Sequence, residues 1–253
     1  MKSLRVLLAI GAIGLWSQSL FAHGGEVSRV ALEPEVISKS AGPSQYKFQL
    51  LDTSTNKLIS DQDLNVAHEK RLHMLIYDPS LKEFQHVHPE FDGVTWTVDV
   101  QFAVDGNYWV WAQGVLAVDG EEFSASNRLE ITDGAVAWPT PSSLGDQRSG
   151  TSGISAIELG KNKIVAGKMV MLDLIMSRTD GTIPKLEPYL GAFAHIVATP
   201  ADADSLIHVH PQETGPNQGM LHATFPSAGE YRLWVQFIDG GSLKTIPLSV
   251  KVY

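Results

Sequence analysis

Hydrophobic and polar residues alternate along much of this chain with a period of two. The alternation is clearest in residues 46–50, 96–102 and 231–237, where large apolar side chains take turns with polar ones. Such a pattern places successive side chains on opposite faces of a half-buried β-strand. Asp-Gly, Asp-Pro and Ala-Gly pairs, which favour turns, separate these segments. Beyond the first residues no segment has a sustained helical period with caps, so the pattern predicts an all-β protein.

The same pattern occurs twice. A shift of 122 residues aligns one half of the chain with the other, and one inserted residue extends the match. The aligned positions are His73, His86, His88 and Pro89 with His195, His208, His210 and Pro211, then Phe102, Gly106, Tyr108, Trp111 and Gln113 with Phe225, Gly229, Tyr231, Trp234 and Gln236. We therefore predict two copies of one domain. Pro, Ser and Gly are abundant between the copies, which indicates a linker.

The fold expected for each copy is an immunoglobulin-like β-sandwich. Many short strands in a unit of about 100 residues favour a sandwich. Residues 105–108 and 228–231 resemble the tyrosine corner of immunoglobulin-like domains, with Val110 and Leu233 where antibody domains carry a cysteine. The chain has no cysteine, so each sandwich must be held by its core and its strand pairing. The predicted boundaries are a signal peptide at 1–22, a first domain at 23–134, a linker at 135–153 and a second domain at 154–253.

The first 22 residues have the organisation of a secretory signal peptide. Lys2 and Arg5 precede an apolar run at 6–16, and small and polar residues lead to Ala22. The run is too short to span a bilayer, although an uncleaved anchor that continues through Phe21 is the alternative. Cleavage after Ala22 predicts a periplasmic or secreted protein with no membrane span.

Cleavage at that position would make His23 the first residue of the mature chain. The free amine and the imidazole of His23 could then chelate copper together as a histidine brace. The alternative is a flexible start, His23-Gly24-Gly25, without a ligand.

The repeated histidines are the candidates for metal binding. His86 and His88, like His208 and His210, are two residues apart, so on a strand both side chains project from one face. Two imidazoles at that spacing can converge on one ion. The proline that follows each pair places it at a strand end or edge, where an ion can enter.

A third histidine completes the set in each copy. His73 and His195 precede these pairs by thirteen residues, which suits a strand, a turn and an antiparallel return. We expect one three-histidine site in each domain. Imidazole ligands without thiolates suit copper, zinc or nickel, and the extracytoplasmic location favours copper. The alternative is that the histidines only form hydrogen bonds that brace the strands.

Other residues near these motifs are weaker candidates. His68 and His222 have no counterpart in the other copy, so we expect them at the surface. Glu90 and Glu213 follow the paired histidines and could add a carboxylate ligand. The repeated tryptophans, Trp111 and Trp234, fit core packing.

Charge and motifs exclude several classes of function. The formal net charge is −9, which disfavours binding to nucleic acid or anionic lipid. The absence of cysteine removes thiolate metal sites, cysteine nucleophiles and lipoprotein anchors. The glycine-rich nucleotide-binding motifs and the G-x-S-x-G motif are absent, and His68-Glu69 lacks the second histidine of a zincin helix. An enzyme is therefore less favoured than a binding protein.

A resemblance to a known family supports the fold. Residues 188–195, 208–211, 229–237 and 248–252 resemble the immunoglobulin-fold modules of YtkA-like bacterial envelope proteins, often found near heavy-metal or copper efflux systems. The first copy is less similar, since residues 69–72 replace the segment before the third histidine. The resemblance implies an envelope protein that stores or delivers metal, or confers resistance, with a metal-transport protein as partner. A metal-dependent enzyme and a structural or adhesive protein remain the alternatives.

Overall fold

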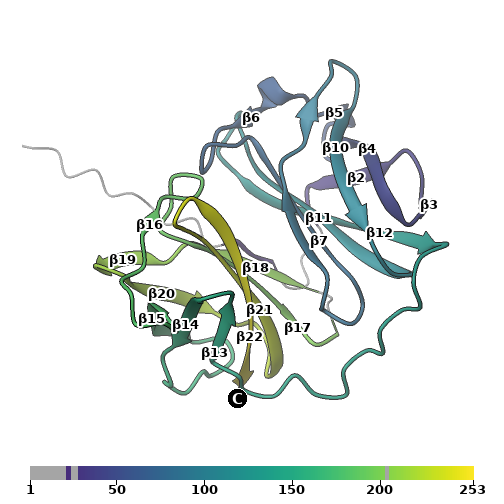
Figure 1. Ribbon diagram of the computed structural model, residues 1–253. Coiled ribbons are helices and arrows are strands. Elements are labelled where there is room, and N and C mark those ends of the chain that lie inside the picture. The colour runs from purple at the N-terminus through teal and green to yellow at the C-terminus, as the bar shows by residue number, and fades with distance from the viewer. Residues whose placement is uncertain (1–20, 24–27, 203–204) are drawn as a thin grey trace, which may run out of the picture.

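The computed structural model describes residues 21–23, 28–202 and 205–253, with the backbone alone for 21–23. These residues form 22 strands and one short 3-10 helix, η1 (Asp61–Asp63). The predicted all-β class, two tandem immunoglobulin-like sandwiches, is confirmed, and the sandwiches lie side by side in Figure 1. None of the helices in the described part of the chain is long and apolar enough to cross a membrane.

The first domain consists of two sheets. One sheet contains, in spatial order, β2 (Val30–Pro34), β4 (Gly42–Asp52), β10 (Trp96–Phe102) and β9 (Glu90–Phe91), with β5 (Lys57–Leu58) beside β4. The other contains β3 (Ser38–Ser40), β12 (Glu122–Thr132), β11 (Gly106–Leu116), β7 (Leu72–Tyr77) and β8 (Phe84–Val87), with β6 (Leu64–Asn65) beside β11. The alternating residues of β10 explain the layers, because Trp96 faces the core while Asp99 faces solvent.

The second domain repeats this arrangement. One sheet contains β1 (Phe21–His23), β18 (Leu206–Val209), β17 (His195–Pro200), β21 (Gly229–Asp239) and β16 (Leu186–Glu187), with β22 (Ser242–Val252) beside β21. The other contains β13 (Ser149–Ser152), β14 (Ser155–Leu159), β15 (Met169–Arg178), β20 (Gln218–Thr224) and β19 (Gln212–Gly215). Each domain has its own apolar core between its two sheets.

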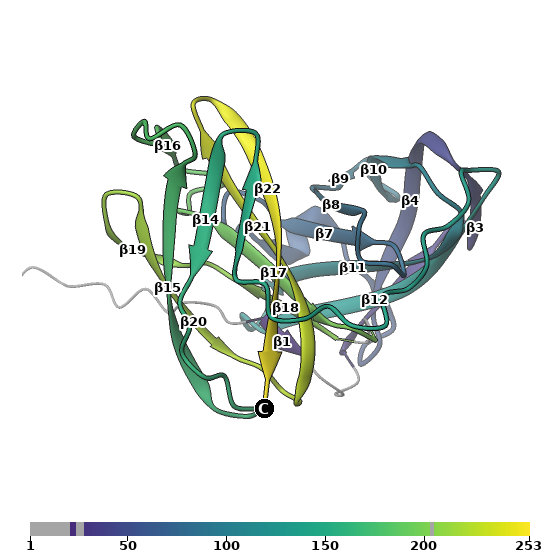
Figure 2. The same cartoon turned by 60° about the horizontal axis from the view of Figure 1, so that its bottom comes forward.

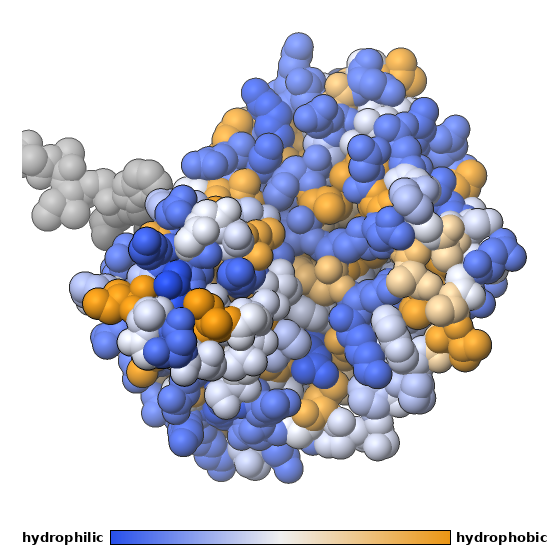
Figure 3. All heavy atoms as spheres, in the orientation of Figure 1, coloured by the Kyte–Doolittle hydropathy of each residue, from blue (hydrophilic) through white to orange (hydrophobic). Residues whose placement is uncertain are grey.

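The two predicted tyrosine corners are present. The hydroxyl of Tyr108 donates to the carbonyl of Val104 at 3.2 Å, and the hydroxyl of Tyr231 donates to that of Ser227 at 3.1 Å. Val110 and Leu233 are fully buried in the cores, where they replace a disulfide by packing. Hydrophilic residues cover most of the face drawn in Figure 3, and hydrophobic ones are scattered among them.

The two domains pack through the outer faces of the sheets that contain β7 and β17. Every residue of these two strands is buried, because one face covers its own core and the other covers the second domain. A third apolar cluster fills this interface, formed by Leu75, Tyr77, Leu81, Trp111, Val197, Leu206 and Trp234. Trp234 stacks on Phe84 of the first domain at 4.5 Å between ring centroids. Figure 2 shows the two sandwiches against each other with these strands between them.

Two of the predicted boundaries need correction. The linker is shorter than 135–153, because β13 lies inside that range and pairs with β14 of the second domain. His23, assigned to the first domain, belongs to β1, which pairs with β18 at the edge of a sheet of the second domain. An open strand edge accepts pairing from any extended segment, and sequence patterning does not reveal which one. The predicted cleavage site after Ala22 falls inside β1, and residues 1–20 of the predicted signal peptide lie outside the described residues.

Candidate metal centre

Two hairpins position the repeated histidines. β7 and β8 pair with Leu75 opposite His86, and β17 and β18 pair with Val197 opposite His208. Val87 packs against the core of the first domain, on the opposite side of β8 from His86. The predicted strand, turn and antiparallel return therefore exist in both copies, and they bring the third histidine to the paired ones.

The six histidines form one cluster at the domain interface, so the trios predicted for the two domains lie next to each other. Within the first copy the ring centroids of His73 and His86 are 5.3 Å apart. Between the copies those of His86 and His208 are 5.2 Å apart, and those of His73 and His208 are 5.7 Å apart. The sequence showed two trios, but only the back-to-back packing of the two sheets makes them neighbours. We call these six residues the imidazole cluster: His73, His86, His88, His195, His208 and His210.

Each domain orients the central histidine of the other domain. The Nδ1–H of His86 donates to Oε1 of Gln236 at 2.8 Å, and the Nδ1–H of His208 donates to Oε1 of Gln113 at 3.1 Å. The amide nitrogen of each glutamine donates in turn to a hydroxyl, of Thr245 and of Ser124. The repeated Trp-x-Gln pattern therefore places a tryptophan in the apolar interface and a glutamine beside the imidazole cluster.

Two tight turns orient His73 and His195 in the same way. The Nε2–H of His73 donates to the carbonyl of Ala67 at 3.0 Å, and that of His195 donates to the carbonyl of Tyr189 at 2.9 Å. Each carbonyl begins a two-residue turn that closes with paired backbone hydrogen bonds. Both central residues of each turn have positive φ, 48° for His68 and 49° for Leu190, as hairpin turns of this length require.

These hydrogen bonds fix which nitrogen of each ring carries the lone pair. A carbonyl oxygen only accepts, so the ring nitrogen that contacts it carries the hydrogen; we call this the outer nitrogen. The outer nitrogen is Nε2 in His73 and His195 and Nδ1 in His86 and His208. The other nitrogen of each neutral ring, the inner nitrogen, carries a lone pair. The inner Nδ1 of His73 lies 3.1 Å from Nε2 of His86, and Nδ1 of His195 lies 3.2 Å from Nε2 of His208. Nε2 of His210 lies 2.9 Å from Nδ1 of His195. Two ligands of one ion at bonds of about 2.0–2.1 Å are separated by about 2.9–3.4 Å, which matches these distances.

Burial keeps the imidazole cluster neutral. It lowers the pKa of His73 to about 4 and the pKa values of His88 and His195 to about 3. The pKa values of His86 and His208 fall well below the ordinary value for the same reason, with further lowering by the neighbouring imidazoles. A neutral imidazole is the form that binds a metal ion. Among the described residues, two groups of three histidines have ligand atoms within 4.8 Å of one another. One contains His73, His86 and His88, and the other contains His86, His195 and His208.

The members of the imidazole cluster differ in burial. His73, His86, His195 and His208 are buried, whereas His88 and His210 are half-buried at the rim. Nε2 of His88 is buried without a hydrogen-bond partner among the described residues. His88 and His210 are therefore the members of the cluster nearest to solvent.

His68 contradicts the prediction that it lies at the surface. Its ring stacks on that of His210 with 3.6 Å between centroids, so a turn of the first domain contacts a histidine of the second. The counterpart of His68 in the second copy is Leu190, so the repeat gave no signal for this contact. Only the folded structure reveals it. His222 lies on β20, in the sheet that does not contain β17 and β18.

Three further candidates lie outside the described site. Glu90 and Glu213 are exposed on β9 and β19, and neither belongs to a described group of potential ligands. The backbone of His23 pairs opposite Leu206 in β1, but its side chain is outside the described residues. The histidine brace at His23 stays a prediction.

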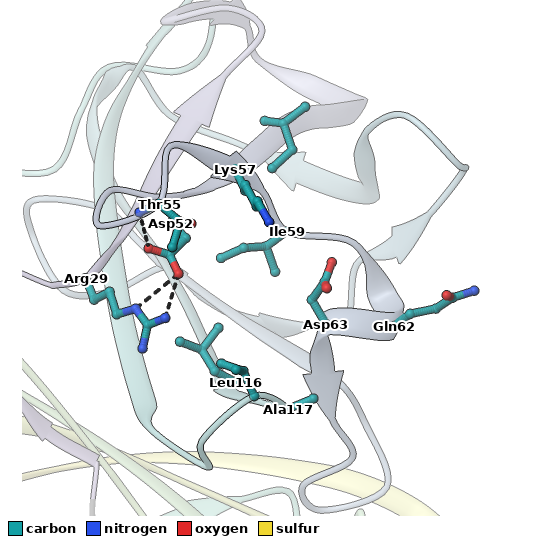
Figure 4. A pocket seen from close by; sticks show the side chains of 11 residues that line it. Arg29, Asp52, Thr55, Lys57, Ile59, Gln62, Asp63, Leu116 and Ala117 are labelled. Atoms are coloured by element: carbon teal, nitrogen blue, oxygen red, sulfur yellow. Dashed lines mark hydrogen bonds and ion pairs between the residues drawn. The ribbon is translucent and has the colours of Figure 1, made fainter.

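A pocket of about 430 Å³ in the first domain is lined by none of the histidines (Figure 4). Arg29 lies at its wall and forms ion pairs with Asp52 at 2.7 Å, Asp119 at 2.6 Å and Glu121 at 3.0 Å. Because Arg29 is paired with all three carboxylates, this pocket offers no ligand set comparable with the imidazole cluster.

A family model matches residues 22–132 and 151–253, most of the chain, and its description is a domain of unknown function, DUF8832. The chain belongs to the DUF8832 family. The resemblance to YtkA-like modules stays a prediction, since the matching model for this DUF8832 protein is a different one. No curated protein matches the chain.

Solved structures resemble the DUF8832 chain only distantly. The Escherichia coli adhesin FdeC is 12% identical over 90% of this chain and 66% of its own, with a TM-score of 0.27. The fibronectin(III)-like modules of Clostridium thermocellum CbhA are 15% identical over 88% of this chain and 93% of theirs, with a TM-score of 0.22. A DUF4785 protein from Legionella pneumophila is 12% identical over 85% and 53%, with a TM-score of 0.28. None of these structures is similar enough to support an inference about function.

Proposed function

We propose that this DUF8832 protein binds copper, or a similar divalent ion such as zinc or nickel, in the imidazole cluster between its two domains. The observation that carries the proposal is the direction of the lone pairs. The outer nitrogens of His73, His86, His195 and His208 donate to protein oxygens, and their inner nitrogens converge at ligand spacing. Neutral acceptors at about 3 Å repel one another unless a cation lies between them.

The chemistry of the site supports copper first. All the described candidate ligands are imidazole nitrogens, which suit copper, zinc and nickel and disfavour calcium and magnesium. The glutamine and carbonyl acceptors around the rings are the outer partners that metal-binding histidines usually have. The signal peptide predicted at 1–22 would place the protein in the periplasm or outside the cell, where storage, delivery or resistance are the corresponding roles. An envelope metal-transport protein is the proposed partner.

Equilibrium dialysis of the purified full-length protein against Cu(II) and Zn(II), followed by elemental analysis, tests the proposal. We expect bound metal in the wild type and none in the double variant His86→Ala/His208→Ala, which removes a buried ligand from each domain. His222→Ala is the matched control, because it removes a histidine from β20 and should leave uptake unchanged. Wild-type protein that takes up neither ion would overturn the proposal.

A structural role without metal is the second candidate. It is favoured by the hydrogen bonds that cross the interface, since His86 with Gln236 and His208 with Gln113 connect the two domains. Under this role the histidine variants would lower stability while the wild type binds no metal. Chemical unfolding of the same variants with and without added copper separates the two roles, because only a bound ion makes the unfolding midpoint depend on copper concentration.

A further inference from the structure

The imidazole cluster contains more ligands than one ion uses. A four-coordinate ion bound at the centre would take four of the six imidazoles and leave two without a function. His88 is an example of an imidazole without an assigned role, since its buried Nε2 has no hydrogen-bond partner among the described residues. The two described groups of ligand atoms share His86 but otherwise contain different histidines. The ligand atoms therefore gather around more than one point.

Each domain contributes three imidazoles that lie next to one another. Three imidazoles bound to one ion at about 2.0–2.1 Å place their ring centroids about 5.2–5.5 Å apart. In the first trio, His73, His86 and His88, the centroids are 5.3, 5.0 and 4.9 Å apart. In the second trio the separations are 5.5, 4.4 and 4.8 Å. The first trio is therefore close to the required geometry. In the second trio His195 and His210 would have to move apart slightly to reach it, and the second described ligand group contains His86 in place of His210.

The two trios are also adjacent. His86 and His208 are the central residues of their trios, and their ring centroids are 5.2 Å apart across the interface. Two ions held by the trios would be near enough to share one small bridging ligand. No carboxylate belongs to the described ligand groups, so a bridging anion such as hydroxide would offset the charge of two divalent ions.

From these observations we infer that the imidazole cluster is a dinuclear centre, in which the three histidines of each domain hold one copper ion and the two ions are neighbours. The inference rests on the proposed function and adds the number and placement of the ions. It also gives the duplication a role, because a single copy of the domain supplies only one half of the centre and lacks the glutamine that orients its own central histidine.

Native mass spectrometry of the full chain, loaded with Cu(II) or Zn(II) and freed of excess metal, tests the inference. We expect two ions per chain in the wild type and in the control His222→Ala. His88→Ala and His210→Ala each remove a half-buried ligand from one trio, and each should retain one ion. Circular dichroism checks that the variants are folded.

Electron paramagnetic resonance of the copper-loaded protein gives a second readout. Neighbouring Cu(II) ions that share a bridge couple their spins, so the integrated signal should be lower than the copper content. In His88→Ala the remaining single ion should give a signal equal to its copper content.

The outcomes separate the two claims. One ion per wild-type chain overturns the dinuclear centre and leaves the proposed function in place, whereas no bound ion overturns both. Loss of both ions in His88→Ala would mean a single indivisible site and would overturn the assignment of one ion to each domain.

Discussion

The two halves of the molecule are most alike where they meet and differ at the rim of the imidazole cluster. Both halves use a glutamine of the partner domain and a turn carbonyl to orient the rings, with hydrogen bonds between 2.8 and 3.1 Å. At the rim, the first half carries His68, which stacks on His210, while the second half has Leu190 in that place. The second half has Tyr189, whose ring contacts His195, where the first half has Ala67. The repeat thus retains the groups that orient the histidines and varies the residues that surround them.

The largest expected effect comes from the tryptophans that join the halves. Trp234→Ala should lower the free energy of unfolding by about 3–5 kcal/mol, because it removes a buried side chain that packs on Phe84 and Tyr77 of the first domain. Trp111→Ala should cost a similar amount, since Trp111 is buried and its Nε1–H donates to the hydroxyl of Tyr77 at 2.8 Å. Trp138→Ala is the control for urea unfolding, because Trp138 is 37% exposed and should matter by less than about 0.5 kcal/mol. An equally small effect of Trp234→Ala would contradict the packed interface.

The next effect concerns pH, in protein freed of metal by a chelator. Burial lowers the pKa of His73 to about 4 and that of His195 to about 3, whereas the unfolded chain has the ordinary value near 6.5. The unfolded state therefore binds protons first, so stability is fully present above about pH 7 and is lost as the pH falls through 6.5 towards these lowered values. The loss should be about 2 kcal/mol per such histidine by pH 5.

Urea unfolding at pH 7.5 and pH 5 measures this loss in both halves. The variants His73→Gln and His195→Gln should each reduce the pH dependence by a similar amount, because the two residues are equivalent in the repeat. If the wild type were equally stable at pH 7.5 and pH 5, these rings would not be buried in their neutral form.

A third prediction compares the two glutamines. Gln236→Leu and Gln113→Leu should each lower copper affinity by about 10–100-fold, because the Nδ1–H of His86 or His208 loses the acceptor that fixes its tautomer. Gln236→Glu retains an acceptor and should bind copper at least as tightly as the wild type. Competition titration with a copper chelator measures all three. If the two leucine variants differed strongly, the two halves would not be equivalent.

The smallest effect is expected where the halves differ. His68→Leu makes the first turn like the second and removes the ring that stacks on His210. We expect copper affinity to fall by less than tenfold and stability to change by less than about 1 kcal/mol, since His68 is only half-buried. The same titration checks it, and a complete loss of copper binding would make His68 a ligand and correct the account of the rim.

Much of the fold could be predicted from the sequence, because strand periodicity and tyrosine corners are local signals. The composition of each histidine trio was also predictable, since His73, His86 and His88 recur with equal spacing in the second copy. The contact between the two trios could not be predicted, because it depends on which faces of the two sheets pack together. His68 was missed for the same reason: its contact with His210 crosses the interface and has no counterpart in the repeat.

Anomalous diffraction at the copper edge from crystals of the copper-loaded protein tests the central claim most directly. The account predicts anomalous density between the domains, within about 2.0–2.1 Å of imidazole nitrogens of His86 on one side and His208 on the other. Copper bound only at surface residues, with none in the imidazole cluster, would contradict it.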